Sequence, residues 1–169
     1  MKSYAARIYS AAVILIAIDQ VLKTWVLYQL KDSEPIVLIG PLTDQMIANT
    51  LQFVFVANTG AAFGFGSNMT VLISVIAVAV VIGLLRWSRK IGDPIWATAT
   101  ALLLAGAAGN LIDRIIQPPG PLRGYVVDFI SIGRFPVFNF ADICITFAAI
   151  TLIFVTLAKR IPEGRNVSE

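Results

Sequence analysis

Four long apolar stretches dominate the sequence, and shorter polar segments separate them. They cover about residues 8–27, 69–85, 95–112 and 140–158, each close to the length that one helix needs to cross a bilayer. The first stretch carries Asp19 and Lys23 and lacks a clear small-x-small cleavage site, so we expect a retained helix and not a signal peptide. The pattern predicts an all-α polytopic membrane protein with four transmembrane helices.

The composition supports this prediction. The chain is 57% hydrophobic and 14% charged, whereas a soluble domain is typically about 25% charged. Because four spans and the short segments that connect them account for the 169 residues, we expect residues 1–169 to form a single integral membrane domain.

The basic residues predict the orientation of the helices. Eight of the thirteen would lie on one side of the membrane: Lys2, Arg7, Arg86, Arg89, Lys90, Lys159, Arg160 and Arg165. The positive-inside rule then places both termini and the second connection in the cytoplasm. The net charge of +3 is therefore mostly a signal of topology, and no basic face interleaved with aromatic residues indicates a nucleic-acid partner.

The two outer connections, residues 32–66 and 117–139, differ in character. The first contains "PIVLIGPL" and "TLQFVFVAN", β-branched and aromatic runs around a Gly40–Pro41 turn, which predict a small sheet on the outer membrane surface. The second begins with "QPPGPLRG" and is then partly apolar. It fits a surface or re-entrant segment better than a span.

The residue inventory narrows the chemistry that the chain can perform. It has no histidine and one cysteine, Cys144, inside an apolar run where packing is the expected role. Zinc sites, Ser-His-Asp triads and Cys-His pairs need imidazole or several thiolates. We therefore expect no metal and no cofactor, and any catalysis must use carboxylates, hydroxyls, Lys or Arg.

The predicted topology gathers many polar residues at the outer interface, and most have a structural explanation. Asp19 and Lys23 are four residues apart and can neutralise each other on one helix face. Asn139 and Asp142 match a capping box at a helix start. Asp113 and Arg114 could pair at the end of the third helix, with a role supporting an active site as the alternative. We expect the last two outer arginines to contact solvent or lipid headgroups: Arg123 and Arg134.

Asp128 is harder to explain as a structural residue. It lies in "YVVDFI", with no basic residue within four positions and no helix start to cap. The flanking residues predict a buried strand or a membrane-dipping segment, where a carboxyl is difficult to ionise. If Asp128 and Asp142 share a water molecule, one can stay protonated while the other activates the water, which is aspartic peptidase chemistry.

Five segments resemble the lipoprotein signal peptidase (signal peptidase II) family in order and in topology: "DQVLK", "NTGAAFG", "GAAGNLIDR", "VVDF" and "FPVFNFAD". The resemblance implies a four-helix aspartic endopeptidase of the bacterial inner membrane, with an extracytoplasmic β-cradle and a second periplasmic loop. It implies lipoprotein maturation: removal of the signal peptide from diacylglyceryl-modified prolipoproteins, immediately before the lipidated cysteine. It further implies an active site at the extracytoplasmic face, membrane lipid as surroundings, a monomer, and inhibition by globomycin-type compounds.

Carried over residue by residue, the resemblance makes Asp128 and Asp142 the catalytic dyad. The residues that it implies for substrate binding and support are Asn58, Gly60, Asn110, Arg114, Asn139, Asp19 and Lys23. Two departures are small: Ala105 replaces a glycine that many members have, and the link from Asp128 to Asn139 looks short. The second departure concerns the shape of the outer loop and leaves the dyad unchanged.

Other membrane functions fit the sequence less well. A proton-coupled transporter or channel would need polar residues at several depths, and a lipid-modifying transferase would need clustered acids for Mg²⁺. A rhomboid-like serine peptidase needs histidine. A presenilin-like peptidase needs a Gly-x-Gly-Asp motif, whose nearest match is "IGDP" at Asp93.

Overall fold

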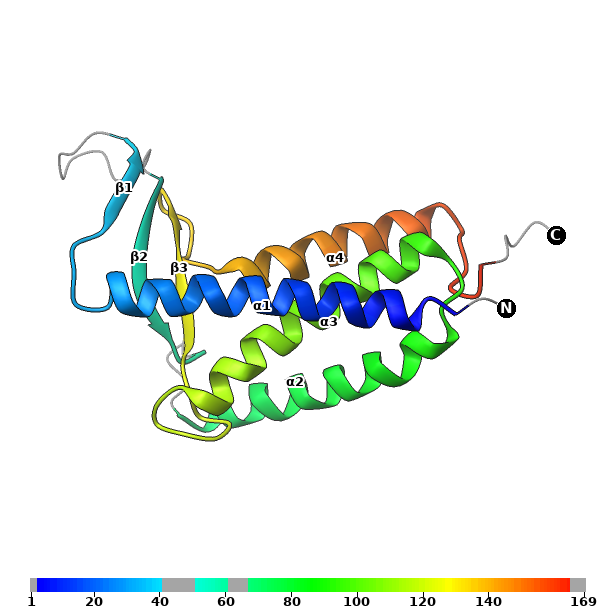
Figure 1. Cartoon of the computed structure of the whole chain (residues 1–169), viewed down its shortest axis with the longest axis horizontal. Helices are drawn as coiled ribbons and strands as arrows, with labels where there is room; N and C mark the ends of the chain where they lie inside the picture. Colours follow the sequence, from blue (N-terminus) through cyan, green and yellow to red (C-terminus); the bar gives the residue numbers. More distant parts are fainter. Residues whose placement is uncertain (1–2, 41–50, 61–66, 165–169) are drawn as a thin grey trace.

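A computed structural model describes residues 3–40, 51–60 and 67–164 of the chain (Figure 1). The elements are α1 (Ala5–Gln29), β1 (Ile36–Ile39), β2 (Leu51–Asn58), α2 (Ser67–Trp87), the short 3₁₀ helix η2 (Ser88–Lys90), α3 (Pro94–Ile116), β3 (Val126–Ile132) and α4 (Phe140–Leu157). Residues 61–64 of the "NTGAAFG" segment, Pro41 of the predicted turn, Lys2 and Arg165 lie outside the described residues.

Within the described residues, four helices are long and apolar enough to cross a membrane, which confirms the predicted fold class. The first three helices extend up to four residues beyond the predicted apolar runs, and α4 ends one residue before the end of its run. The limits of α3 have local causes, because Asp93 caps its start by accepting from the N–H groups of Ile95 and Trp96. Its end precedes the Pro118–Pro119 pair, which cannot continue a helix.

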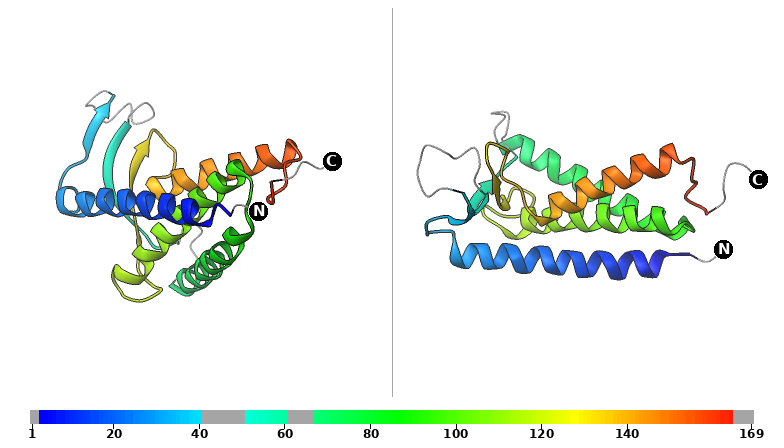
Figure 2. Two further views of the ribbon diagram at one scale, coloured as in Figure 1. Left: turned by 45° about the vertical axis from the view of Figure 1, so that its right-hand side comes forward. Right: turned by 90° about the horizontal axis from the view of Figure 1, so that it is seen from above.

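The central helix is α3, which packs against α1, α2 and α4 (Figures 1 and 2). Two glycines let its neighbours approach closely. A Cβ on Gly106 would lie 2.5 Å from the carbonyl oxygen of Ala141, and one on Gly109 would lie 2.7 Å from Asp19 Oδ2. These contacts bring α1 and the start of α4 together on α3.

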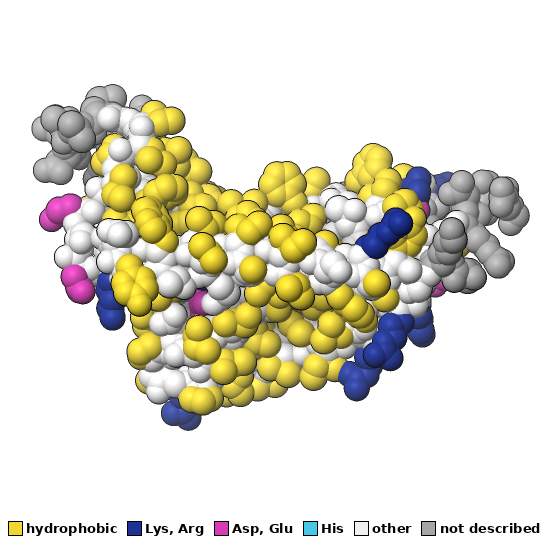
Figure 3. Space-filling view, viewed as in Figure 1, with side chains coloured by type: hydrophobic (Ala, Val, Ile, Leu, Met, Phe, Trp, Pro, Cys, Tyr) yellow, Lys and Arg dark blue, Asp and Glu magenta, His cyan; other side chains and the backbone are white. Residues whose placement is uncertain are grey.

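The outward faces of the helices are apolar. Hydrophobic side chains cover the bundle in Figure 3, while Lys and Arg gather mainly toward one end. The exposed large hydrophobic residues include Val13, Ile14, Leu72, Val75, Ile150 and Phe154. Apolar surface of this extent on a helical bundle is what contact with lipid requires.

The three strands form one antiparallel sheet in the order β1-β2-β3. The register pairs Val56 with Asp128 and Asn58 with Val126, with an irregularity between Phe53 and Val56. The sequence predicted a sheet from the first outer connection alone. The second connection adds β3, because the "YVVDFI" run pairs with β2.

The sheet lies at one end of the bundle, opposite the end where the chain begins and finishes (Figure 1). Backbone hydrogen bonds tie the chain segments together at that opposite end: Tyr4 N donates to Ile91 O at 3.0 Å, and Gly92 N and Asp93 N donate to Pro162 O at 2.8 Å and 3.0 Å. A buried cluster of Val26, Leu30, Val127 and Phe129 fixes β3 against the other end of α1. This packing sets the position of Asp128.

Candidate active site

Asp128 lies in the middle of β3 and is only 2% exposed. Alternation along the strand directs it away from the face of Val127 and Phe129. Its Oδ2 accepts from Asn58 Nδ2 at 2.8 Å, and its Oδ1 accepts from Asn139 Nδ2 at 2.6 Å. The carboxyl is therefore buried with both oxygens hydrogen-bonded to neutral amides.

Burial raises the pKa of Asp128 to about 6. The hydrogen bonds from Asn58 and Asn139 oppose this rise, and the nearby Asp142 carboxylate adds to it. Because Lys23 acts only from a distance, it lowers the pKa least among these influences. The result is a carboxyl group that can exchange a proton near neutral pH.

Asp142 belongs to the first turn of α4 and forms the predicted capping box with Asn139. Its backbone N–H donates to Asn139 Oδ1 at 3.0 Å, and its Oδ2 accepts from the Asn139 backbone N–H at 3.1 Å. Its Oδ1 also accepts from Asn110 Nδ2 at 2.9 Å. Two N–H donors and the positive end of the helix dipole thus stabilise negative charge on this carboxylate.

Asn139 connects the two carboxyl groups. Its backbone contacts Asp142, whereas its side-chain amide donates to Asp128 and, at 3.1 Å, to Asn110 Oδ1. The side chain is fully buried, so its hydrogen bonds hold a fixed geometry. The structure therefore brings Asp128 and Asp142, which are separated in sequence by a loop, into one hydrogen-bonded network.

A buried group of charges supports this network from α1 and α3. Lys23 Nζ lies 2.9 Å from Asp19 Oδ2 and 3.0 Å from Asp113 Oδ2, and it donates to Asn110 Oδ1 at 2.9 Å. Asp19 Oδ1 in turn accepts from the backbone N–H of Ala141 at 3.0 Å. The cluster thereby fixes both the Asn110 amide and the start of α4.

The membership of this cluster differs from the sequence analysis in one respect. Asp113 interacts with Lys23 and with Gln20 Nε2, and its Oδ2 accepts from Val127 N at 3.0 Å. No salt bridge joins Asp113 to Arg114 among the described residues. Successive helical residues point about 100° apart, so Asp113 faces α1 and Arg114 does not. The sequence contained a signal for this role of Asp113, because Asn110 and Asp113 are three residues apart and share a helix face.

Arg114 is buried beside the first outer connection. Its Nη1 donates to the carbonyl oxygen of Gly124 at 3.4 Å. A Cβ on Gly60 would lie 3.4 Å from Arg114 Nη2 and 2.9 Å from Ile73 Cδ1, and Gly60 has a positive φ of 79°. Gly60 N also donates to Asn58 Oδ1 at 2.8 Å. Glycine is thus required here for conformation and for space, and it links Arg114 to Asn58.

An apolar hollow of about 390 Å³ adjoins Asp142. Sequence reasoning did not identify it, because its walls come from the loop before α4 and from one face of that helix. The other lining residues are Phe135, Pro136, Val137, Phe138, Ile143, Thr146 and Phe147. The carboxylate therefore lies at the edge of a surface that suits an apolar ligand.

Comparison with known proteins identifies the family. The model of the family described as Signal peptidase (SPase) II matches residues 11–158. The lipoprotein signal peptidase of Mycobacterium tuberculosis is 38% identical over 148 residues, which are 88% of this chain and 69% of that protein. The lipoprotein signal peptidase of Streptomyces coelicolor is 39% identical over 163 residues, 96% of this chain and 76% of that protein.

A solved structure gives the same answer for the fold. A bacterial membrane enzyme determined by the in meso method at 1.9 Å resolution superposes with a TM-score of 0.74 and 29% sequence identity. The match covers 92% of this chain and 96% of that one. These similarities confirm the resemblance seen in the sequence: the chain belongs to the signal peptidase II family and is a multi-pass membrane peptidase.

Proposed function

We propose that this peptidase is an aspartic endopeptidase that removes the signal peptide from diacylglyceryl-modified prolipoproteins, with Asp128 and Asp142 as its dyad. The family and the names of its relatives support the reaction. One observation carries the catalytic assignment: Asn139 joins both carboxyl groups in a buried network at one end of the spanning helices. The reaction is the final cut in lipoprotein maturation, immediately before the lipidated cysteine.

The two acids are not equivalent, and we assign them different protonation states. Asp128 is buried in a strand, and burial raises its pKa to about 6, so it holds the proton of the pair. Asp142 is partly exposed at the start of α4, where the capping box and the helix dipole support its charged form. This division gives one acid and one base without histidine or metal.

The reaction then follows from these states. Asp142 takes a proton from a water molecule as the water oxygen bonds to the carbonyl carbon of the scissile amide. Asp128 donates a hydrogen bond to the carbonyl oxygen, which stabilises the charge that develops there. When the C–N bond breaks, Asp128 transfers its proton to the leaving amine. The products are a free carboxyl terminus and the amino group of the lipidated cysteine.

The supporting residues keep the dyad in place. Lys23 occupies Asn110 Oδ1, which directs the Asn110 amide N–H toward Asp142. Asp19 holds the start of α4 through Ala141 N. Asn58 holds Asp128, with Gly60 behind it. Arg114 is a buried cation beside this site that suits a polar group or a lipid ester of the substrate.

The site lies where such a substrate would present the scissile bond. A lipidated cysteine stays at the membrane surface, and the preceding signal segment lies in the bilayer, so the bond reaches the depth of the dyad without extraction. The apolar hollow beside Asp142 suits the lipid or the signal segment. The basic residues at the opposite end of the bundle support this orientation, with the dyad at the extracytoplasmic face and the termini in the cytoplasm of a bacterial inner-membrane protein.

The remaining properties belong to the same proposal. The chain acts as a single domain and as a monomer, surrounded by lipid. It needs no cofactor, because the two carboxyl groups supply the acid and the base. Globomycin-type compounds are expected to inhibit it, as the family resemblance implies.

The test compares one prolipoprotein with and without diacylglycerol on its cysteine. Purified wild-type protein in lipid nanodiscs is expected to cut only the modified form, and mass spectrometry of the product locates the new amino terminus at the lipidated cysteine. Equal cleavage of both forms would contradict the proposed substrate. No cleavage of an efficiently modified substrate would contradict the reaction itself.

A further inference from the structure

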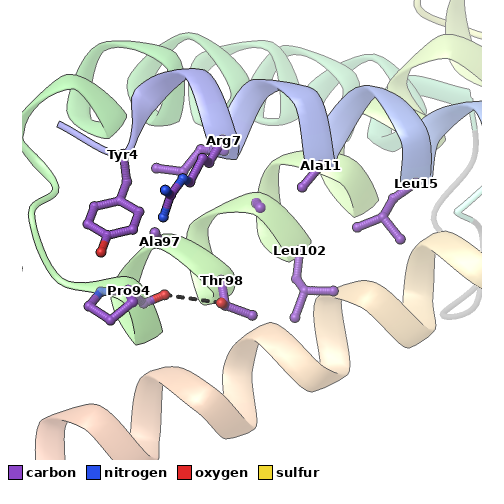
Figure 4. Close-up of a pocket in the computed structure, with 10 residues that line it drawn as sticks. Tyr4, Arg7, Ala11, Leu15, Pro94, Ala97, Thr98 and Leu102 are labelled. Carbon is purple, nitrogen blue, oxygen red and sulfur yellow. Dashed lines mark hydrogen bonds between the residues drawn. The ribbon is translucent and has the colours of Figure 1, made fainter.

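A second hollow lies at the end of the bundle opposite the dyad, between the first half of α1 and the first half of α3 (Figure 4). It has a volume of about 340 Å³. Its walls include Tyr4, Arg7, Ala11, Leu15, Ala97 and Leu102. The ribbon of α4 runs along the other side of α3 in Figure 4, so the hollow forms a groove on α3 beside α1.

Small residues create the groove, and its wall is apolar. Ala11, Ala97 and Ala101 leave space where larger side chains would fill the gap between the two helices. The Thr98 hydroxyl donates to the carbonyl oxygen of Pro94 at 3.1 Å, shown dashed in Figure 4, so its hydrogen bond is already made. The inner part of the groove therefore offers mostly apolar contact to a ligand.

The end of the groove nearest the chain termini is cationic. Arg7 is exposed, and its guanidinium lies 5.2 Å from the centre of the Tyr4 ring, which holds it at the mouth of the groove. Among the described residues, no acidic side chain forms a salt bridge with Arg7. The groove thus combines an apolar floor with one cation at its mouth.

The length of the groove matches one leaflet of a bilayer. Its lining along α1 runs from Tyr4, the N-cap residue, to Leu15, and eleven helical steps span about 16 Å. Half of the hydrocarbon core of a bilayer is about 15 Å thick. An acyl chain in the groove would therefore reach from the membrane surface to the midplane, with its headgroup beside Arg7.

We propose that this groove binds one anionic phospholipid from the leaflet on the side of the termini. The lipid phosphate pairs with Arg7, and one acyl chain lies along Ala11, Ala97 and Leu102. Charge argues against the signal segment of a substrate as the occupant, because signal peptides begin with a basic region that would meet Arg7 at the same surface. Nothing in the peptidase mechanism uses this groove, so the proposal is independent of it.

Native mass spectrometry of the delipidated full-length protein tests the proposal. The probes are phosphatidylglycerol and phosphatidylcholine with identical acyl chains, added separately and together. The variants are Arg7→Gln, which removes the cation at the mouth, and Thr98→Phe, which puts a ring into the groove from an exposed position. Lys159→Gln is the matched control, because it removes an exposed cation at the same end of the bundle. Thermal midpoints verify that each variant is folded.

We expect the wild type to retain one phosphatidylglycerol in preference to phosphatidylcholine. Arg7→Gln is expected to lower that preference about fivefold, Lys159→Gln to leave it unchanged, and Thr98→Phe to reduce retention of both lipids. If Arg7→Gln keeps the wild-type preference for phosphatidylglycerol, or if Lys159→Gln loses this preference equally, the assignment of the headgroup to Arg7 is wrong. Full retention in Thr98→Phe would overturn the groove as the binding site. If a synthetic signal peptide, added as a third probe, displaces the lipid, the signal segment and not a phospholipid is the occupant of the groove.

Discussion

Replacing Lys23 with methionine tests whether the buried charges hold the site together. Lys23 forms two ion pairs, at 2.9 Å with Asp19 and 3.0 Å with Asp113, and the three side chains are 1–2% exposed. Methionine keeps the length of the side chain but leaves both carboxylates without their cation. Loss of one partner from a buried ion pair costs about 3–5 kcal/mol. We expect Lys23→Met to lower the free energy of unfolding by this amount.

The measurement is reversible unfolding of purified protein in mixed micelles, with SDS as denaturant and tryptophan fluorescence as signal. Lys159→Met is the matched control at the opposite end of the bundle, where Lys159 is exposed and forms no salt bridge among the described residues. Loss of an exposed cation of this kind changes the free energy of unfolding by at most about 0.5 kcal/mol. Equal losses in the two variants, or a loss below about 1 kcal/mol in Lys23→Met, would refute the reasoning.

A double variant separates charge from packing. The cluster of two carboxylates and one ammonium has a formal charge of minus one. Lys23→Met with Asp113→Asn restores that charge, so we expect it to recover about 0.5–3 kcal/mol of the loss. Simple addition of the two single losses would indicate that the residues do not act as one unit.

Two further predictions concern proton transfer and helix packing. Burial raises the pKa of Asp128 to about 6, and the proposed mechanism requires its protonated form. We therefore expect kcat/KM to fall as the pH rises through about 6, and a level profile up to about pH 8 would contradict this. A Cβ at Gly109 would lie 2.7 Å from Asp19 Oδ2, so Gly109→Ala should cost about 1–3 kcal/mol in SDS unfolding. A Cβ at Gly83 meets nothing within 4 Å, so Gly83→Ala should be neutral or gain up to about 1 kcal/mol; equal effects would contradict the packing at Gly109.

The spanning helices were predictable because the length of an apolar run is a local property of the sequence. The residues at which the helices end were harder to predict. The apolar run of α3 stops near residue 112, yet the helix continues to Ile116. Asp113 and Arg114 lie in this extension, and their side chains are buried by partners from α1 and from the loop before β3. The sequence pattern indicated that these charged residues lie at the membrane–water interface, because the partners that bury them are distant in sequence.

The sheet shows the same limit. The run around Asp128 was consistent with a strand or with a membrane-dipping segment, and only its pairing distinguishes them. That pairing joins Asn58 to Val126, far apart in sequence. The sequence therefore placed the sheet in the first outer connection and could not include β3.

The candidate site combines local and distant signals. The capping box of Asn139 and Asp142 is a local pattern within four residues, and it is present in the structure. The same Asn139 side chain also donates to Asp128, so its structural role and its link to the second acid coexist. From the sequence alone, a capping role and an active-site role of Asn139 were alternatives. The sequence pattern does not show which distant group the side-chain N–H of Asn139 contacts.

Cleavage by the two aspartate variants tests the central claim most directly. Asn keeps the size of Asp but cannot exchange a proton, so Asp128→Asn and Asp142→Asn should each lower the rate on a diacylglyceryl-modified prolipoprotein by about 10²–10⁴-fold. Asp32→Asn, at an exposed position just after α1, is the matched control and should cleave like the wild type. If either dyad variant is folded and retains the wild-type rate, that aspartate is a structural residue and the proposed mechanism is wrong.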